Sequence, residues 1–422
     1  MTDQPALARK PAHQTSRRGT VFTRLFAHQE SGLVLVILLL MAAMTIYGVI
    51  FPVKAKTPMA LSETTTVRFL DADGIEHGNG VLGRNEILVF RVTTDGQTIE
   101  YPSASIDRYD SQTHTLYTLS SKNPFLNKDN LVLVVKNASF FAIMAVGMTG
   151  VIILAGIDLS VGSIYGFCAI LGAMALNTLG TEASWMLSIP IGLGVCVLAG
   201  ALCGFANGAM TVGFGVHPFV ITLGMMATLR GLTVYTSQAV FDKQSIGNLS
   251  SSFTTGFVKR EFFGVYPVPI IFMILVAIAG WFVLTRTVFG RRILAIGGNE
   301  TAAKYAGIPV GRVKILVYTI TGALAGLSAA LYIGYLGSAE TNAGNAYELQ
   351  VIAATVIGGA SLMGGRGTVF GAVLGAIIIQ LINNAMVNLG VDPSVNQIVM
   401  GAAIILAVVI DQSKQRLATR RG

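Results

Sequence analysis

Long runs of apolar residues, separated by short polar or glycine-rich breaks, dominate the chain. A helix needs about 20 apolar residues to cross the ~30 Å hydrocarbon core of a bilayer. Ten runs reach or approach that length, at residues 31–51, 137–155, 161–179, 189–212, 218–236, 267–284, 313–334, 347–362, 368–389 and 396–410. The pattern therefore predicts an all-α integral membrane protein with about ten transmembrane helices.

The first run, within 31–52, follows a polar leader formed by residues 1–30. No small-residue cleavage site follows it, so we expect this helix to stay in the membrane as an anchor. The transmembrane core then covers 129–412, with a polar loop at 285–312, and a short tail closes the chain at 413–422.

A polar stretch between the first and second runs, 53–128, departs from this pattern. Apolar and polar residues alternate in it at 65–69, 87–93 and 115–119, and Asp73-Gly74 and Asp95-Gly96 are typical of turns. Loops of this length are translocated largely regardless of their charge. We therefore expect a small, β-rich, extracytoplasmic insert after the first helix.

Composition excludes a soluble enzyme. Only 12% of the residues are charged and the mean hydropathy is +0.65, whereas soluble domains carry about 25% charged residues. The net charge of +8 gathers in the tail 1–30, in the loop 285–312 and in the tail 413–422. Cytoplasmic segments carry the Lys/Arg excess, so both termini are predicted to be cytoplasmic. The positive charge then reports topology, and no nucleic acid partner is expected.

Polar residues inside the apolar runs are the candidates for a transport pathway. Asp158 and Ser160 lie at the junction of the second and third runs. They either cap the third helix or line a polar break that faces a cavity. Arg230, near the outer end of the fifth run, either lines the pathway or extends to the membrane surface.

Four more polar residues have two interpretations each. Asn207 and Thr222 either bond across helices or face a substrate, and Glu348 and Gln350, which open the eighth run, face water or a substrate. Glycine ladders at 200–208 and 367–375 predict close helix packing. The predicted pathway set is Asp158, Ser160, Asn207, Thr222, Arg230, Glu348 and Gln350.

The cytoplasmic loop contains a short predicted helix that begins at Asn299 and ends at Gly307. It is too polar for lipid and offers a surface of small residues, Ala302, Ala303 and Ala306, to a partner protein. The alternative is an ordinary surface loop.

Several motifs resemble the permeases of binding-protein-dependent ABC importers of the ribose/galactose/xylose type. They are Gly-Ile-Asp-Leu-Ser-Val-Gly at 156–162, Ala-Asn-Gly at 206–208, Pro-Phe-Val-Ile-Thr-Leu-Gly at 218–224, Phe-Gly-Arg at 289–291 and Ala-Ile-Gly-Gly-Asn at 295–299. The resemblance runs from about residue 130 to 412, in the family's order, and includes the first run. The insert 53–127 departs from the usual short permease.

The resemblance implies a subunit of the bacterial cytoplasmic (inner) membrane that imports a small sugar. It implies a homodimer or a pair of related permeases, a two-domain ATPase beneath it and a soluble sugar-binding protein outside. It also makes the short loop helix the coupling helix, with Thr301 where the wider pattern has Glu. The coupling residues would be Gly298, Asn299, Glu300, Ala302, Ala303 and Gly307.

The chain contains no Gly-x-x-x-x-Gly-Lys-Ser/Thr phosphate-binding loop. We therefore expect no enzymatic activity and no cofactor in this chain, with ATP bound by the partner subunit. An ion-coupled secondary transporter would need ionisable groups at the membrane midplane, and only Asp158 is a candidate. A channel, or an importer of branched-chain amino acids or nucleosides, stays open as an alternative.

Overall fold

A computed structural model describes most of the chain. The described residues are 29–51, 53–60, 66–71, 76–78, 87–94, 97–102, 106–110, 115–123, 125–241 and 244–391, with isolated positions up to 405. Most of the predicted basic tail 1–30 and all of the tail 413–422 lie outside them.

Eight helices of the described part are long and apolar enough to cross a membrane. They are α2 (Gln29–Ile50), α3 (Lys128–Ile153), α4 (Val161–Leu179), α5 (Trp185–Phe214), α6 (Pro218–Phe241), α7 (Pro267–Arg286), α10 (Val310–Leu336) and α12 (Val369–Asn388). The prediction of a multi-pass, mainly helical membrane protein is confirmed. Shorter helical segments are η2 (Thr254–Val258), α8 (Val288–Gly298), α9 (Glu300–Tyr305) and α11 (Tyr347–Ile357).

The predicted span 347–362 is wrong as a single transmembrane helix. Its helix, α11, has 11 residues, about 16 Å at 1.5 Å per residue. A non-helical segment precedes it, in which β9 (Ala339–Glu340) pairs with β8 (Ser245–Ile246). Helix α11 begins at the predicted residue, Tyr347, but ends at Ile357. Gly359 follows with a φ of 94°, and this left-handed backbone does not continue a helix. Most of the tenth predicted span, 396–410, lies outside the described residues and stays a prediction.

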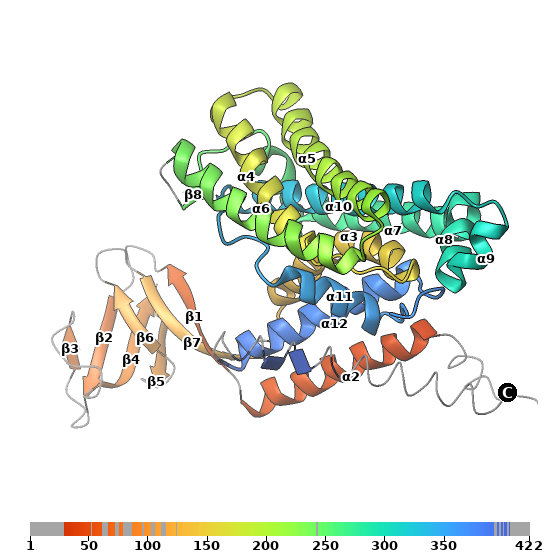
Figure 1. Cartoon of the computed structure of the whole chain (residues 1–422). Coiled ribbons are helices and arrows are strands. Elements are labelled where there is room, and N and C mark those ends of the chain that lie inside the picture. Colours follow the sequence, from red (N-terminus) through yellow and green to blue (C-terminus); the bar gives the residue numbers. More distant parts are fainter. Residues whose placement is uncertain are drawn as a thin grey trace, which may run out of the picture.

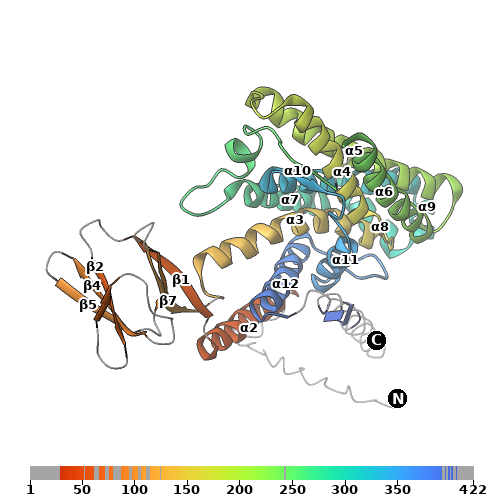
Figure 2. The same ribbon diagram turned by 90° about the vertical axis from the view of Figure 1, so that its left-hand side faces the viewer.

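Helix α10 is the centre of the bundle, with α3, α4 and α5 packed around it. In α5, Gly200 and Gly204 lie against the α10 backbone at Gly322 and Tyr318, where an added Cβ would collide. The glycine ladders are thus packing faces, as predicted. Figures 1 and 2 show α4 and α5 on α10, while α11 and α12 lie along α3. Helices α3 and α10 are therefore the two central helices of the bundle, and α4, α5, α7 and α12 pack against them.

Seven strands lie between α2 and α3 in the part of this segment that the structure describes. They are β1 (Val53–Ala60), β2 (Thr66–Asp71), β3 (Glu76–Gly78), β4 (Ile87–Thr94), β5 (Gln97–Pro102), β6 (Ile106–Asp110) and β7 (Thr115–Lys122). They form a sheet of order β1-β7-β6 and a sheet of order β3-β2-β4-β5. Alternate residues of both sheets, including Val67, Phe90 and Leu116, form a small buried core. The strands lie beyond the start of α3, at the opposite end of the molecule from α8 and α9 (Figure 1).

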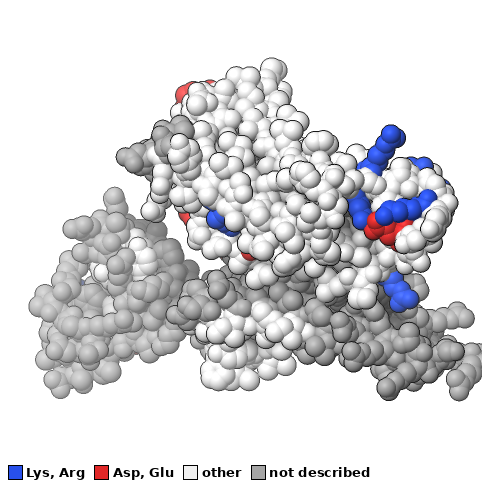
Figure 3. All heavy atoms as spheres, viewed as in Figure 1, with Lys and Arg blue, Asp and Glu red and all other residues white. Residues whose placement is uncertain are grey.

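Charged side chains concentrate at the α8–α9 end of the bundle. Figure 3 shows Lys and Arg gathered there, while the middle of the described surface in that view is almost uncharged. A wide uncharged belt is what a lipid-facing surface requires, since a charge in the hydrocarbon is costly.

Candidate substrate pathway and coupling helix

Asp158 organises the break between α3 and α4. Helix α3 ends at Ile153, and Ala155 turns the chain with a φ of 58°. Asp158 is fully buried, and its Oδ1 accepts hydrogen bonds from the Ser160 backbone N–H (2.8 Å) and hydroxyl (2.6 Å). Ser160 occupies the N-cap position of α4 but makes no side-chain cap bond. Both residues thus fold the loop rather than cap the helix.

Two transmembrane helices bring further polar groups to this loop. Asn207 of α5 donates from Nδ2 to the Ser160 hydroxyl (2.7 Å), and the Thr222 hydroxyl of α6 donates to the carbonyl of Ile157 (3.4 Å). Three of the predicted pathway residues, Asp158, Ser160 and Asn207, therefore form one hydrogen-bonded network, and Thr222 bonds to the same loop. Among the described residues, Asp158 Oδ2 and Asn207 Oδ1 are buried without a hydrogen-bond partner. The network is uncharged except for the carboxyl group, and it retains unused acceptors.

Arg230 and Glu348 form a second polar site beside α4. Arg230 lies near the middle of α6, not at its outer end, and its Nη1 donates to the Ala343 carbonyl at 2.8 Å. The interpretation that it extends to the membrane surface is therefore wrong. A Cβ at Gly162 of α4 would meet Glu348, and a Cβ at Gly166, one turn further, would lie near Arg230. The two charged side chains thus lie over one glycine face of α4, near enough to attract each other.

Gln350 belongs to a third site, which sequence reasoning largely missed. Its Oε1 accepts a hydrogen bond from Asn383 Nδ2 of α12 at 3.1 Å. Both side chains line a cavity of about 270 Å³, here called the aromatic–amide pocket. Its lining residues are Asn137, Phe140, Phe141, Tyr165, Tyr332, Tyr347, Gln350, Gln380, Asn383 and Val387. A signal was available in the sequence, because Gln380 and Asn383 interrupt an otherwise apolar run.

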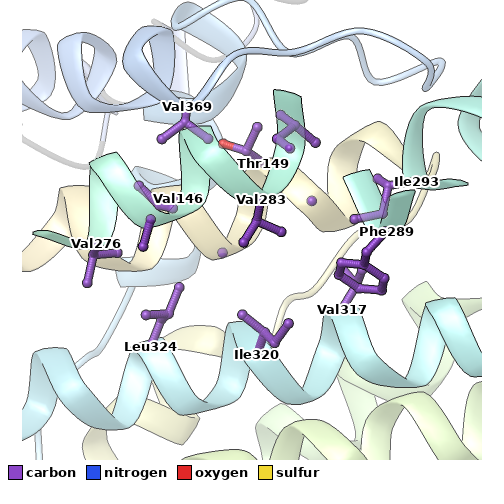
Figure 4. A pocket seen from close by; sticks show the side chains of 15 residues that line it. Val146, Thr149, Val276, Val283, Phe289, Ile293, Val317, Ile320, Leu324 and Val369 are labelled. Atoms are coloured by element: carbon purple, nitrogen blue, oxygen red, sulfur yellow. The ribbon is translucent and has the colours of Figure 1, made fainter. Parts of the chain in front are cut away.

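A second cavity offers no comparable chemistry. It measures about 200 Å³ and is lined by apolar side chains of α3, α7, α8, α10 and α12, such as Val146, Val276 and Leu324 (Figure 4). Its one polar side chain, Thr149, already donates its hydroxyl to the Ala145 carbonyl at 2.8 Å. A polar solute gains no hydrogen bond there.

The predicted coupling helix is present as α9. Asn299 caps it through Oδ1, which accepts from the Ala302 N–H at 2.9 Å, and Gly307 follows its end with a φ of 77°. Both predicted boundaries are confirmed. The predicted partner surface needs one correction, since Ala303 is 4% exposed and packs into the protein. Ala302 and Ala306 are exposed, and Tyr305, which the sequence did not single out, is 89% exposed.

Glu300 connects α9 to the transmembrane bundle. Its carboxylate accepts from Lys314 Nζ of α10 (2.8 Å) and pairs with Lys304 of its own helix (2.9 Å). The hydrogen bond from Lys314, with a further one from Lys304, lowers the pKa of Glu300 below its ordinary value. The carboxylate is therefore charged at neutral pH, and the link between α9 and α10 is ionic.

The end of α8 also touches the pathway loop. Gly297 lies against the Ile153 carbonyl at the end of α3, so closely that a Cβ would collide. The same carbonyl accepts a hydrogen bond from the Gly365 N–H at 2.8 Å. Asp158 follows Ile153 by five residues, so the contact of Gly297 lies close in sequence to the polar network.

Two comparisons with known proteins agree on the family of this chain. A family described as "Branched-chain amino acid transport system / permease component" matches residues 130–408. The chain belongs to this permease family. It is 39% identical over 301 residues to the ribose import permease protein RbsC of Escherichia coli K12, covering 69% of this chain and 88% of the relative. It is also 39% identical over 298 residues to the RbsC of Bacillus subtilis 168 (70% and 89%).

A third relative, the D-allose transport system permease protein AlsC of E. coli K12, is 38% identical over 288 residues, covering 68% of this chain and 85% of the relative. No solved structure matches the chain. The family match begins after the seven strands, so it rests on the helical core. The chain is accordingly a transport component of an importer, not its ATPase.

Proposed function

We propose that this chain is the permease subunit of an ATP-driven importer that moves a small sugar, a pentose or hexose, across the bacterial inner membrane. The observation that carries the proposal is the extensive similarity to permeases named for ribose and allose. The polar network is consistent with such a substrate. A neutral polyol needs hydroxyl and amide partners without a fixed counter-charge, and Ser160, Asn207 and Thr222 supply them.

In the proposed arrangement the α8–α9 end faces the cytoplasm. This places Arg291, Arg292, Lys304 and Lys314 on the side where basic residues accumulate, and it puts the strands on the outer side. Both termini are then cytoplasmic. The strands would stand beside the docking site of the extracytoplasmic binding protein. The permease would act as a homodimer or beside a related permease, because the exposed apolar faces of α5 and α6 are available for lipid or for a second subunit.

ATP hydrolysis by a separate subunit would act through α9. Its exposed face, with Ala302, Tyr305 and Ala306, is compact and suits a groove on the ATPase. Motion of α9 would reach α10 through Glu300 and Lys314, and α3 through the contact of Gly297. The chain itself would bind neither ATP nor another cofactor.

Import of a branched-chain amino acid is the second candidate, and one observation favours it. Arg230 and Glu348 offer one charge of each sign within the bundle, which suits a zwitterion. The family description names such substrates as well. Sugar import is preferred because the pathway network itself is neutral apart from Asp158.

Uptake by the reconstituted importer tests the two candidates. The permease, its ATPase and its binding protein are placed in liposomes, and uptake of labelled D-ribose, D-allose, D-galactose and L-leucine is measured with and without ATP. ATP-dependent uptake of a sugar is expected. Uptake of leucine without any sugar would overturn the sugar assignment and retain the importer.

A further inference from the structure

We infer that the aromatic–amide pocket is a sugar-binding subsite within each permease subunit. The inference rests on the proposed import of a sugar and adds the residues that hold it. Five rings line the cavity: Phe140, Phe141, Tyr165, Tyr332 and Tyr347. Four amides line it as well: Asn137, Gln350, Gln380 and Asn383.

The aromatic rings and the amides of the pocket match the two kinds of surface on a sugar. A pyranose or furanose ring presents C–H faces that pack on aromatic rings, and hydroxyls at its edge that need both donors and acceptors. Amides offer both in one side chain. Binding sites for small molecules combine apolar and aromatic walls with a few convergent polar groups. The cavity of about 270 Å³ is slightly smaller than the ~300 Å³ at the lower end of the size range of such sites.

The rings form a connected wall rather than scattered core residues. Tyr165 stands 5.3 Å from Tyr347 and 5.5 Å from Tyr332, measured between ring centroids. Phe141 lies 4.6 Å from Tyr347 on the other side. Tyr332 and Tyr347 are only half-buried, so the wall retains exposed ring surface to which a sugar can bind.

Several polar atoms of the pocket have no protein partner. Among the described residues, the Tyr165 hydroxyl, Gln380 Nε2 and Asn383 Oδ1 are buried and unbonded. Tyr165 is fully buried and Gln380 is 6% exposed. Burying a polar atom without a hydrogen-bond partner destabilises the protein, so a sequence that keeps three such atoms around one cavity favours a ligand with hydroxyl groups.

The position of the pocket complements the Asp158 network. Phe140 lies near the middle of α3, whereas the Asp158 loop follows the end of that helix at Ile153. Thirteen residues of helix separate the two levels, about 20 Å at 1.5 Å per residue. In the proposed orientation, the pocket lies nearer the outer side than the network does. A sugar released by the binding protein would therefore meet the pocket first.

Two variants and two matched controls test the subsite. Asn383→Ala removes the partner of Gln350 and an unpaired acceptor. Asn384→Ala, at the next position, instead disrupts the amide pair with Asn130 (2.6 Å) outside the pocket. Tyr347→Leu removes a ring of the wall, and Tyr347→Phe keeps it.

The complex of permease and ATPase is placed in nanodiscs, and saturation-transfer NMR measures binding of D-ribose, D-allose and D-galactose, without the binding protein. For the sugar that is transported, Asn383→Ala should raise the apparent Kd about three- to tenfold, the effect of one lost hydrogen bond. Tyr347→Leu should reduce the transfer to the ring protons. Asn384→Ala and Tyr347→Phe should bind like the wild type.

Uptake in liposomes separates a failure of the subsite from a failure of the proposed function. If the wild type transports a sugar and Asn383→Ala and Tyr347→Leu bind it like their controls, the subsite is overturned and the importer remains. If the wild type transports leucine and no sugar, both proposals fall.

Discussion

The ionic link between α9 and α10 gives a direct test of coupling. Lys314→Met removes the α10 partner of Glu300 and keeps the length of the aliphatic side chain. Glu300 then retains only Lys304, which belongs to α9 itself. We expect the importer that contains this variant to hydrolyse ATP but to transport less sugar per ATP, because motion of α9 is no longer transmitted to α10 through this pair.

The structure sets the size of the effect. The two charged atoms are 2.8 Å apart, and the side chains are 20% (Lys314) and 39% (Glu300) exposed, so solvent screens the pair. Pairs with this degree of exposure contribute about 0.2–1 kcal/mol. The linked geometry should therefore lose about fivefold in population at most, and thermal unfolding should change little. Transport per ATP should fall by a similar factor.

The assay compares ATP hydrolysis and sugar uptake in the same liposomes. Lys314→Arg, which preserves the charge, should restore the ratio, and Lys304→Ala, which removes only the pair within α9, should leave it near the wild-type value. High salt should lower the wild-type ratio toward that of Lys314→Met, since salt screens exposed pairs. An unchanged ratio in Lys314→Met, or an equal loss in Lys304→Ala, would refute the argument.

The sign of the pH dependence follows from Glu300. Lys314, with Lys304, lowers its pKa in the folded protein. The stabilisation is therefore complete above the pKa of the unfolded chain, and it is lost as the pH falls through the lower pKa of the folded state. The ratio of uptake to hydrolysis should not change between about pH 8 and pH 6 as a result of this group.

Three further predictions concern the pathway loop and α9. Asp158→Asn keeps an acceptor for both Ser160 donors, so it should impair uptake without reducing the amount of inserted protein. Asp158→Ala should also lower the free energy of unfolding by about 1–3 kcal/mol. Full uptake by Asp158→Asn would leave Asp158 only the loop-folding role. Asn299→Ala removes the cap and should destabilise α9 by about 0.5–2 kcal/mol, seen as weaker co-purification of the ATPase; undiminished co-purification would contradict the assignment of α9. Tyr305→Ala should weaken that association with less than about 0.5 kcal/mol change in stability, and equal ATPase binding by this variant and the wild type would exclude Tyr305 from the interface.

The features that the sequence predicts correctly are those that a single local rule determines. Apolar runs identified the long helices because lipid tolerates only internally bonded backbone. The ends of α9 followed from an Asn cap and a glycine that adopts positive φ. The glycine ladders gave correct packing faces because backbone contact leaves no room for a side chain.

The features that the sequence predicts wrongly or not at all are those whose geometry depends on segments far apart in the chain. The span at 347–362 has the composition of a transmembrane helix, yet its helix α11 ends at Ile357. The backbone before α11 is not helical either: it pairs with β8 and supplies a carbonyl to Arg230. Hydropathy does not register such a break. The aromatic–amide pocket was missed for a related reason, because its residues come from five helices and no spacing connects them.

The broken segment also explains how charged groups persist inside the bundle. A regular helix bonds its own carbonyls and has none to spare for Arg230. Ala343 lies in a turn, where its carbonyl is not used by a helix, and that carbonyl accepts from Nη1. Glu348 in the first turn of α11 then supplies the opposite charge. The non-helical segment before α11 is thus the feature that accommodates a cation in the membrane-spanning region, since non-helical backbone at this depth is stable only where the protein buries it.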